Sequence, residues 1–383
     1  MAAEIEILGI DDLRSLSGIK WNKFPSDVLA AWVADMDVRP PPCVNRALAE
    51  LVDRADFGYN RRASELLADT FARWQLESHG WSPPTEEVRV FCDVLQAIDV
   101  ALWLHTDPGD GIILLTPIYP PFIRAVDGAG RRIIDVPLDP DGWRLDPARL
   151  RAAVDGDTRA VLLCSPHNPT GRVFDRDELT AIAEVANEHD LLVVSDEVWA
   201  DLVHPGATHV PLASIGDEVA ARTVTVSSAS KAFNLAGLRC AVAHVGHAGV
   251  AARLDALPGH LLGAVGTPGA EAAIAAWTDG RDWLAALRRH LTARRDQLAR
   301  RLATELPRVG FDSPEATYLA WLDFRELGLG DDPSARLLDL ARVALGSGPD
   351  FGPRGNGFGR LNFATSEDLL DDMLDRLVSA INA

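Results

Sequence analysis

Short apolar runs alternate with longer segments of helical periodicity between about residues 85 and 245. Several of these runs are uniformly apolar, which is typical of strands buried on both faces. Strands that alternate with crossover helices indicate a mostly parallel sheet flanked by helices. We therefore predict an α/β domain with strands at Val88–Cys92, Gly111–Leu115, Ile133–Val136, Ala160–Cys164, Leu191–Ser195, Thr223–Ser227 and Arg239–Val245.

A second, smaller unit is predicted after about residue 255, where the sequence becomes rich in Gly and Ala. A long Arg-rich helical pattern over Asp282–Leu306 leads into this unit. The apolar positions that follow it predict both strands and a helix, which is an α+β unit. Its other elements are strands at 317–324 and 358–364 and a closing helix over Glu367–Ile381. The expected organisation is an N-terminal segment (1–45) that packs on the small domain, a large domain (46–280) and a small C-terminal domain (281–383).

The composition is that of an acidic globular protein. Apolar residues make up 47% of the 383 residues, which is enough for a large core, and 37 basic against 56 acidic residues give a net charge of −19. Such a surface repels phosphate backbones and anionic lipids, so we expect neither nucleic acid nor membrane as a partner. No signal peptide or run of eighteen apolar residues is seen, and the four cysteines lie far apart, so we expect a cytoplasmic protein without a metal site.

Lysine is scarce in this chain. Of the 37 basic residues 34 are arginine, and the three lysines are Lys20, Lys23 and Lys231. A guanidinium neither forms a Schiff base nor loses its proton near neutral pH, so a lysine kept against this bias is a candidate for amine chemistry. Lys20 and Lys23 lie in a polar stretch and are expected to be solvated charges.

Lys231 lies in the segment SSASKAFNLAGLR (227–239), directly after a predicted strand. Small hydroxyl residues such as Ser228 let hydroxyl and backbone donors reach an anion while the amine points at the same site. Arg239 supplies a bidentate fork for a phosphate. The alternative is a solvated lysine in a loop. The segment resembles the cofactor-lysine motif of the pyridoxal-phosphate enzymes of aminotransferase fold type I, which implies a Schiff base between Lys231 and the cofactor.

Three further segments resemble this family in order and spacing. SPHNPTG (165–171) implies that Asn168 donates to the phenolic oxygen of the cofactor, and TPIYPPF (116–122) implies that Tyr119 stacks on its ring. VVSDEVWADL implies that Asp196 pairs with the pyridine nitrogen and keeps it protonated, so that the ring withdraws electrons. Taken alone, the three would be a turn, a core aromatic residue and a helix N-cap.

The resemblance implies that the cofactor phosphate binds at the start of a helix in FCDVLQA (91–97). In the family, backbone N–H groups at this position donate to the phosphate, and here these groups belong to Val94 and Leu95. The sequence departs from many relatives at Asp93, where a small residue is usual. An anion aimed at a phosphate would repel it, so we expect Asp93 to cap the helix or to face away. Tyr59, in FGYN, resembles the tyrosine that reaches the phosphate or substrate of the neighbouring subunit in a homodimer; a buried core tyrosine is the alternative.

Arg360, in GRLNFA (359–364), resembles the family's arginine that holds the substrate α-carboxylate. With so many arginines a chance match is the alternative, although a lone charge in an apolar strand needs a partner. A second departure is Trp199, where relatives usually place a tyrosine or histidine near the phenolic oxygen. An indole can donate a hydrogen bond to that oxygen but cannot share its proton.

The opening WVADMD (32–37), with DEVWADL, TYLAWLDFRELGL and GNGFGRLNFATS, most resembles the MalY/PatB group of cystathionine β-lyases. This resemblance implies an amino-acid substrate and a carbon–sulfur β-lyase that converts L-cystathionine or a related cysteine S-conjugate to pyruvate, ammonia and a thiol, with Lys231 removing the α-proton. The alternative is an aminotransferase acting on an L-amino acid. A lesser one is a cofactor-binding regulatory protein that acts through a protein partner.

Overall fold

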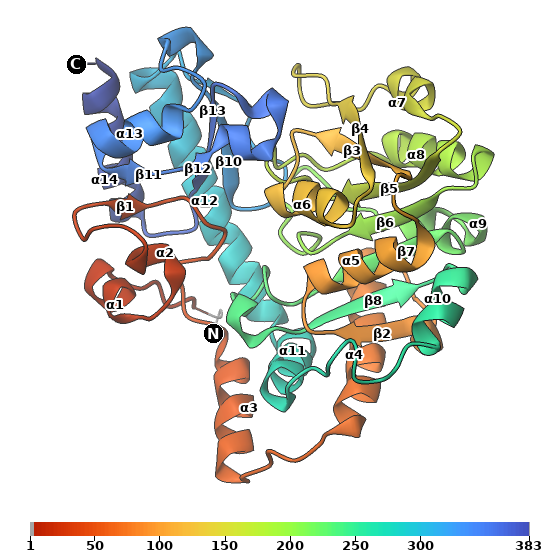
Figure 1. Cartoon of the computed structure of the whole chain (residues 1–383). Helices are drawn as coiled ribbons and strands as arrows, with labels where there is room; N and C mark the ends of the chain where they lie inside the picture. Colours follow the sequence, from red (N-terminus) through yellow and green to blue (C-terminus); the bar gives the residue numbers. More distant parts are fainter. Residues whose placement is uncertain (1–3, 383) are drawn as a thin grey trace.

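The computed structural model describes residues 4–382 and contains a large seven-stranded sheet (Figure 1). The strand order is β2-β8-β7-β6-β5-β3-β4. β8 runs antiparallel to both of its neighbours, and the other pairings are parallel. The predicted α/β class with a mostly parallel seven-stranded sheet is therefore confirmed. The strands are β2 (Val88–Phe91), β3 (Gly111–Thr116), β4 (Arg132–Pro137), β5 (Thr158–Cys164), β6 (Leu192–Asp196), β7 (Thr223–Ser227) and β8 (Ala241–Val245).

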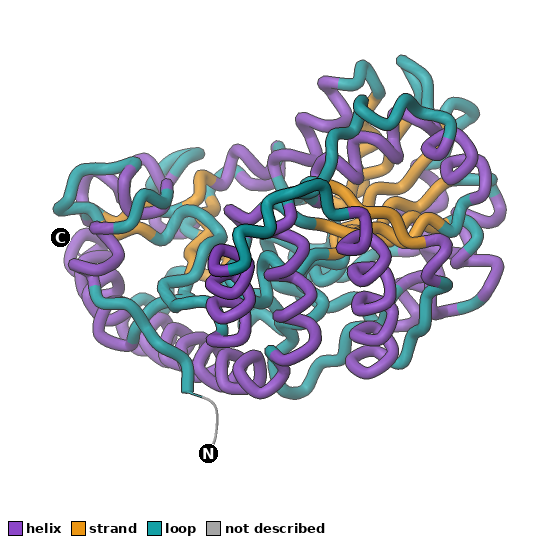
Figure 2. The backbone as a smooth tube through the Cα atoms, turned by 90° about the horizontal axis from the view of Figure 1, so that it is seen from below, coloured by secondary structure: helices purple, strands orange, loops and turns teal. Residues whose placement is uncertain are grey.

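Both faces of the large sheet are buried, which explains the uniformly apolar runs. In β3, Ile112 and Leu114 belong to one hydrophobic cluster, while Ile113 and Leu115 belong to another. Alternate side chains of a strand point to opposite faces, so each face has its own core. Helices cover the strands on both sides (Figure 2). The helices of this part are α3 (Pro42–Asp53), α4 (Arg61–His79), α5 (Val94–His105), α6 (Pro120–Gly128), α7 (Pro147–Ala153), α8 (Arg176–Glu188), α9 (Asp217–Ala220), α10 (Ala248–Asp255) and α11 (Thr267–Asp279).

The C-terminal part forms a second group of strands, joined to the large sheet by the long helix α12 (Arg281–Glu305; Figure 1). Its four-stranded sheet has the order β12-β13-β10-β9, and the N-terminal strand β1 pairs in parallel with β11. The N-terminal segment therefore lies on the C-terminal part. The remaining elements are α1 (Ile10–Ser15), α2 (Ile19–Asn22), β1 (Leu29–Ala30), β9 (Gly310–Phe311), β10 (Leu319–Asp323), α13 (Pro333–Ala341), β11 (Val343–Ala344), β12 (Gly346–Ser347), β13 (Phe358–Asn362) and α14 (Glu367–Asn382).

Two expectations about charged residues need correction. Lys20 is not solvated: its Nζ lies 2.9 Å from Asp37 Oδ2, and both side chains are at most 5% exposed. Trp21 also donates to Asp37 (2.8 Å), so the folded N-terminal segment holds this carboxylate beside Lys20. Arg239 precedes β8, which begins at Ala241, and lies in the loop with a left-handed φ of 52°.

None of the helices in residues 4–382 is both long and apolar enough to cross a lipid bilayer.

Candidate active site

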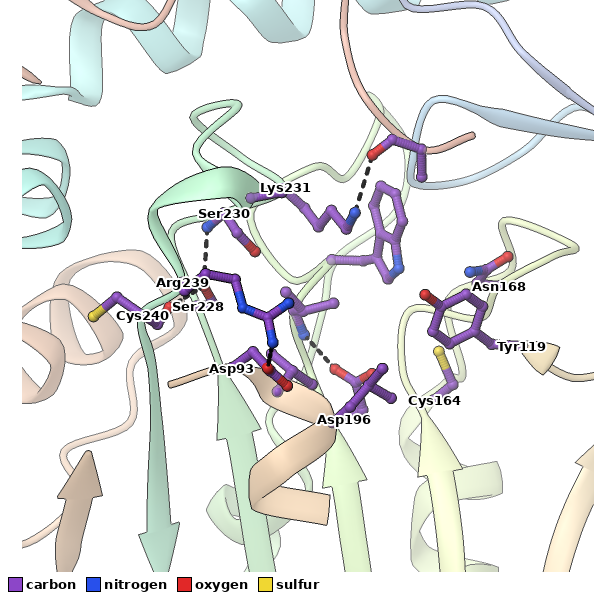
Figure 3. Close-up of a pocket in the computed structure, with 16 residues that line it drawn as sticks. Asp93, Tyr119, Cys164, Asn168, Asp196, Ser228, Ser230, Lys231, Arg239 and Cys240 are labelled. Carbon is purple, nitrogen blue, oxygen red and sulfur yellow. Dashed lines mark hydrogen bonds and ion pairs between the residues drawn. The ribbon is translucent and has the colours of Figure 1, made fainter. Parts of the chain in front are cut away.

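A cavity of about 150 Å³ lies at the carboxyl ends of the central strands (Figure 3). β6 ends at Asp196, β7 leads into the loop with Lys231, and β5 leads into the loop with Asn168. Carboxyl ends of parallel strands share one edge of a sheet, so residues far apart in sequence meet there. The cavity is lined by these residues and by Asp93, Val94, Leu95, Tyr119, Trp199, Ser228 and Arg239.

The amine of Lys231 points into this cavity from the loop after β7. Its Nζ donates to the carbonyl of Ala34 (3.0 Å) and lies 5.7 Å from the centre of the Trp199 ring. Burial lowers the pKa of Lys231, since removal from water penalises the ammonium. An amine with a lowered pKa is a better nucleophile and base near neutral pH.

Asp196 is a buried acid at the end of β6, with 3% of its surface exposed. Its Oδ1 accepts from the N–H of Val198 (3.0 Å), and it forms no ion pair within residues 4–382. Burial raises the pKa of Asp196 to about 7. A protonated nitrogen of a ligand would supply the missing counter-charge.

One end of the cavity is rich in donors for an anion. α5 begins at Val94, and helix geometry leaves the N–H groups of Val94 and Leu95 without intrahelical acceptors. Ser228 also lines this end; its Oγ donates to the Cys240 carbonyl (2.6 Å) and accepts from the N–H of Ser230 (3.0 Å). The Arg239 guanidinium is present there as well. The N–H groups of α5 and the Arg239 guanidinium suit a phosphate, and the Ser228 hydroxyl can join them by turning away from the Cys240 carbonyl.

Asp93 has two partners at this end of the cavity. Its Oδ1 caps α5 by accepting from the N–H of Gln96 (2.9 Å), and its Oδ2 accepts from the Arg239 guanidinium (Figure 3). The carboxylate therefore caps the helix without facing away from the cavity. It neutralises part of the positive charge that would attract a phosphate.

Arg360 lies in β13 and lines a second cavity, of about 400 Å³, which shares Ala34, Tyr119 and Lys231 with the first. Its guanidinium donates to Asn168 Oδ1 (2.9 Å) and to the Trp32 carbonyl (3.0 Å), and it forms no ion pair within residues 4–382. Burial lowers the pKa of Arg360 to about 10. A buried cation held only by neutral oxygens is suited to a carboxylate ligand.

The same hydrogen bond orients Asn168. Because Oδ1 accepts from Arg360, the amide nitrogen is turned toward the cavity, as Figure 3 shows. Tyr119 lies beside it, with its phenol on the cavity wall. The loops after β3 and β5 thus bring a ring and an amide donor to the same wall.

Tyr59 is not brought to the cavities of its own chain. It lies between α3 and α4 with its side chain fully exposed, which contradicts the alternative of a buried core tyrosine. Val52 and Phe57, on the same hairpin, are 62% and 64% exposed. A contact between Tyr59 and a neighbouring subunit stays a prediction.

Sequence reasoning missed Tyr318 and the carbonyl of Ala34. Tyr318 is buried, donates to the Ala34 carbonyl (2.9 Å) and meets the Trp199 ring edge to face at 4.9 Å. Ala34 therefore accepts from both Tyr318 and Lys231. Asn362 fixes this segment by donating to the carbonyls of Val33 (2.7 Å) and Asp35 (2.6 Å). The signals in the sequence were that Tyr318 is one of three tyrosines and that it lies in TYLAWLDFRELGL, one of the segments that resemble the family.

Comparison with known proteins places this site in a family. The sequence profile of aminotransferase class I and II matches residues 33–377, and the chain belongs to that family. It is 35% identical over 374 residues to cystathionine beta-lyase PatB of Bacillus subtilis, covering 95% of this chain and 96% of the relative. The resemblance inferred from the sequence motifs is confirmed.

Two solved structures are similar along nearly the whole chain. Cystalysin from Treponema denticola, whose crystals contain pyridoxal 5′-phosphate, has 28% identity and a TM-score of 0.92 over 100% of this chain and 99% of that one. N-succinyldiaminopimelate aminotransferase from Mycobacterium tuberculosis has 33% identity and a TM-score of 0.84 over 91% and 92% of the two chains. The fold thus accommodates both a cystalysin and an aminotransferase.

Proposed function

We propose that the protein is a pyridoxal-phosphate-dependent carbon–sulfur β-lyase that cleaves L-cystathionine or a related cysteine S-conjugate to pyruvate, ammonia and a thiol. The observation that carries this proposal is the end-to-end similarity to a cystathionine beta-lyase. The amine, the buried acid and the buried guanidinium around two joined cavities support it.

The residues present fit pyridoxal phosphate. Asp196 is a buried carboxyl group without a counter-ion and matches the ring nitrogen. Ser228, Arg239 and the first turn of α5 match the phosphate, and Lys231 matches the aldehyde. When bound, the cofactor supplies an electron sink for the bond that breaks at the substrate α-carbon. Tyr119 and Asn168 are proposed to contact its ring and phenolic oxygen.

The chain's own residues then have separate tasks. Arg360 is proposed to hold the α-carboxylate by charge-assisted hydrogen bonds and to set which bond of the α-carbon faces the amine. Lys231 Nζ accepts the α-proton, which its lowered pKa favours. Loss of that proton and of the β-thiolate gives an enamine, which water converts to pyruvate and ammonia.

We also propose a homodimer in the cytoplasm. The exposed apolar hairpin of Val52, Phe57 and Tyr59 supports a subunit contact that brings Tyr59 of the partner subunit to the site. The four cysteines are unpaired, which is typical of a reducing compartment.

The activity is tested with the cofactor-loaded protein and L-cystathionine, in the absence of any keto acid. We expect pyruvate and free thiol in equal amounts over many turnovers, since β-elimination regenerates the enzyme. Conversion that stops after one equivalent and resumes when a keto acid is added would establish an aminotransferase, the alternative that one of the similar structures favours.

Replacing Asp93 is expected to strengthen cofactor binding. Asp93→Asn keeps an oxygen to cap α5 but removes the anion paired with Arg239. One charge at a site where the Arg239 side chain is 66% exposed contributes about 1 kcal/mol, so we expect the dissociation constant of pyridoxal phosphate to fall about fivefold. Titration of the cofactor-free protein, followed by tryptophan fluorescence, measures it.

Asp69→Asn is the control, because it removes an exposed carboxylate of α4 that lies outside the lining of either cavity. We expect its dissociation constant to be close to that of the wild type. Weaker binding by Asp93→Asn would show instead that Asp93 holds Arg239 in place for the phosphate.

A further inference from the structure

The second cavity extends beyond the groups that a simple amino acid needs. Its lining includes the buried Arg360 and the partly buried Lys231. Its walls are aromatic and include Phe24, Trp32 and Phe351. Exposed charged side chains, those of Lys23, Arg124 and Asp350, line it as well. The cavity is thus lined by a buried cation, by a second group of exposed charges and by aromatic side chains.

Lys23 is held on the wall of this cavity by aromatic contacts. Its Nζ lies 4.1 Å from the centre of the Trp32 ring and 5.3 Å from that of Phe24. The carbonyl of the same Trp32 accepts from Arg360. Cation–π contact fixes the ammonium without neutralising it, and Lys23 forms no ion pair within residues 4–382.

Arg124 contributes a second cation from another element. It lies in α6, which begins directly after Tyr119, and its guanidinium has neither an ion pair nor a hydrogen bond to other described residues. Asp350 lines the same cavity but does not come within 4.0 Å of Arg124. In a chain of net charge −19, two unpaired cations on one cavity form a local site for an anion.

The other acidic residue of the cavity is already engaged. Asp332 caps α13 by accepting from the N–H of Ser334 (3.1 Å), and its second oxygen accepts from Ser347 Oγ (3.0 Å). Asp350 has no hydrogen bond to other described residues through its side chain. It is the carboxylate left to meet a ligand cation.

We propose that Lys23 and Arg124 bind the carboxylate of the leaving thiol, and that Asp350 faces its ammonium group. This subsite rests on the proposed lyase function and narrows the substrate to thioethers that carry an amino acid at each end, as L-cystathionine does. Arg360 takes the carboxylate next to the reacting carbon, and the aromatic wall contacts the thioether chain between the two ends.

The test compares L-cystathionine with S-ethyl-L-cysteine, whose leaving thiol has no charge. The cofactor-loaded wild type, Lys23→Gln, Arg124→Gln and the double variant are assayed for kcat and KM with both. We expect the ratio of kcat/KM for cystathionine to that for S-ethylcysteine to fall about tenfold in each single variant and further in the double variant. The loss should be in KM, because the subsite lies away from the reacting carbon.

Arg300→Gln serves as the matched control, since it removes an exposed cation on α12 that is not part of the cavity lining. An unchanged ratio in the double variant would overturn the subsite. So would a wild type that cleaves S-ethylcysteine but not cystathionine, with the lyase function intact. A wild type that cleaves neither would show that the lyase function itself is wrong, and the subsite would fall with it.

Discussion

Lys231→Ala is expected to abolish the cleavage of L-cystathionine, with kcat lower by about 10⁴-fold or more. The variant loses both the covalent anchor of the cofactor and the base that takes the α-proton. No other lysine replaces it, because Lys20 is paired with Asp37 in the core and Lys23 lies over Trp32. Pyruvate release under saturating substrate measures the loss, and the absorbance of lysine-linked cofactor should disappear.

Lys231→Arg is the informative control. It keeps a cation near Ala34 and Trp199 but cannot form the covalent link or lose a proton. We expect it to be as inactive as the alanine variant while retaining a wild-type melting curve. Substantial turnover by either variant would show that Lys231 is neither the cofactor anchor nor the base of the reaction.

Asp196→Asn is expected to change activity and stability in opposite directions. Without a carboxylate the ring nitrogen is not kept protonated, so we expect kcat/KM to fall about 10³-fold. In the cofactor-free protein, however, the ionised buried carboxylate lowers the free energy of unfolding, and asparagine carries no such charge. The variant should then be more stable than the wild type at alkaline pH.

The direction of this stability change follows from the pKa of Asp196, which burial raises from 3.8 to about 7. Between these values the folded protein binds a proton that the unfolded chain has lost, so the wild type loses stability as pH rises from about 4 to 7. We expect the advantage of Asp196→Asn to be absent at pH 4 and to reach about 2–4 kcal/mol at pH 8.

Urea unfolding of the cofactor-free proteins at pH 4 and pH 8 measures this difference. Asp69→Asn, on the exposed side of α4, is the control and should be neutral at both values. A stability difference between Asp196→Asn and the wild type that is the same at the two pH values would show that Asp196 is ionised at no cost in the folded chain.

The strands of the large sheet could be predicted because both of their faces are buried. A run such as Ile112–Leu115 is apolar at each position, since alternate side chains enter two different cores. The ends of elements were less certain: β8 starts two residues later than expected, because Arg239 has a left-handed backbone and belongs to the loop. Local periodicity does not reveal such a turn.

Candidate site residues could be predicted where a motif follows a strand, as for Asn168, Asp196 and Lys231. Contacts between distant segments could not. The pair of Asp93 with Arg239 joins residues 146 positions apart, and Tyr318 reaches Ala34 across 284 positions. Lys20 was expected in water for the same reason, since its partner is brought close only by the folded N-terminal segment.

The scarcity of lysine bears on how this chain meets reactive aldehydes, such as reducing sugars. Primary amines are their targets, whereas the arginines that replace lysine here react far less readily as amines. Of the three lysines only Lys23 has an exposed side chain, because Lys20 is enclosed with Asp37 and Lys231 lies in the cavity. In the cofactor-loaded protein we therefore expect slow glycation to modify Lys23, at the second cavity, while the proposed Schiff base with the cofactor occupies the amine of Lys231.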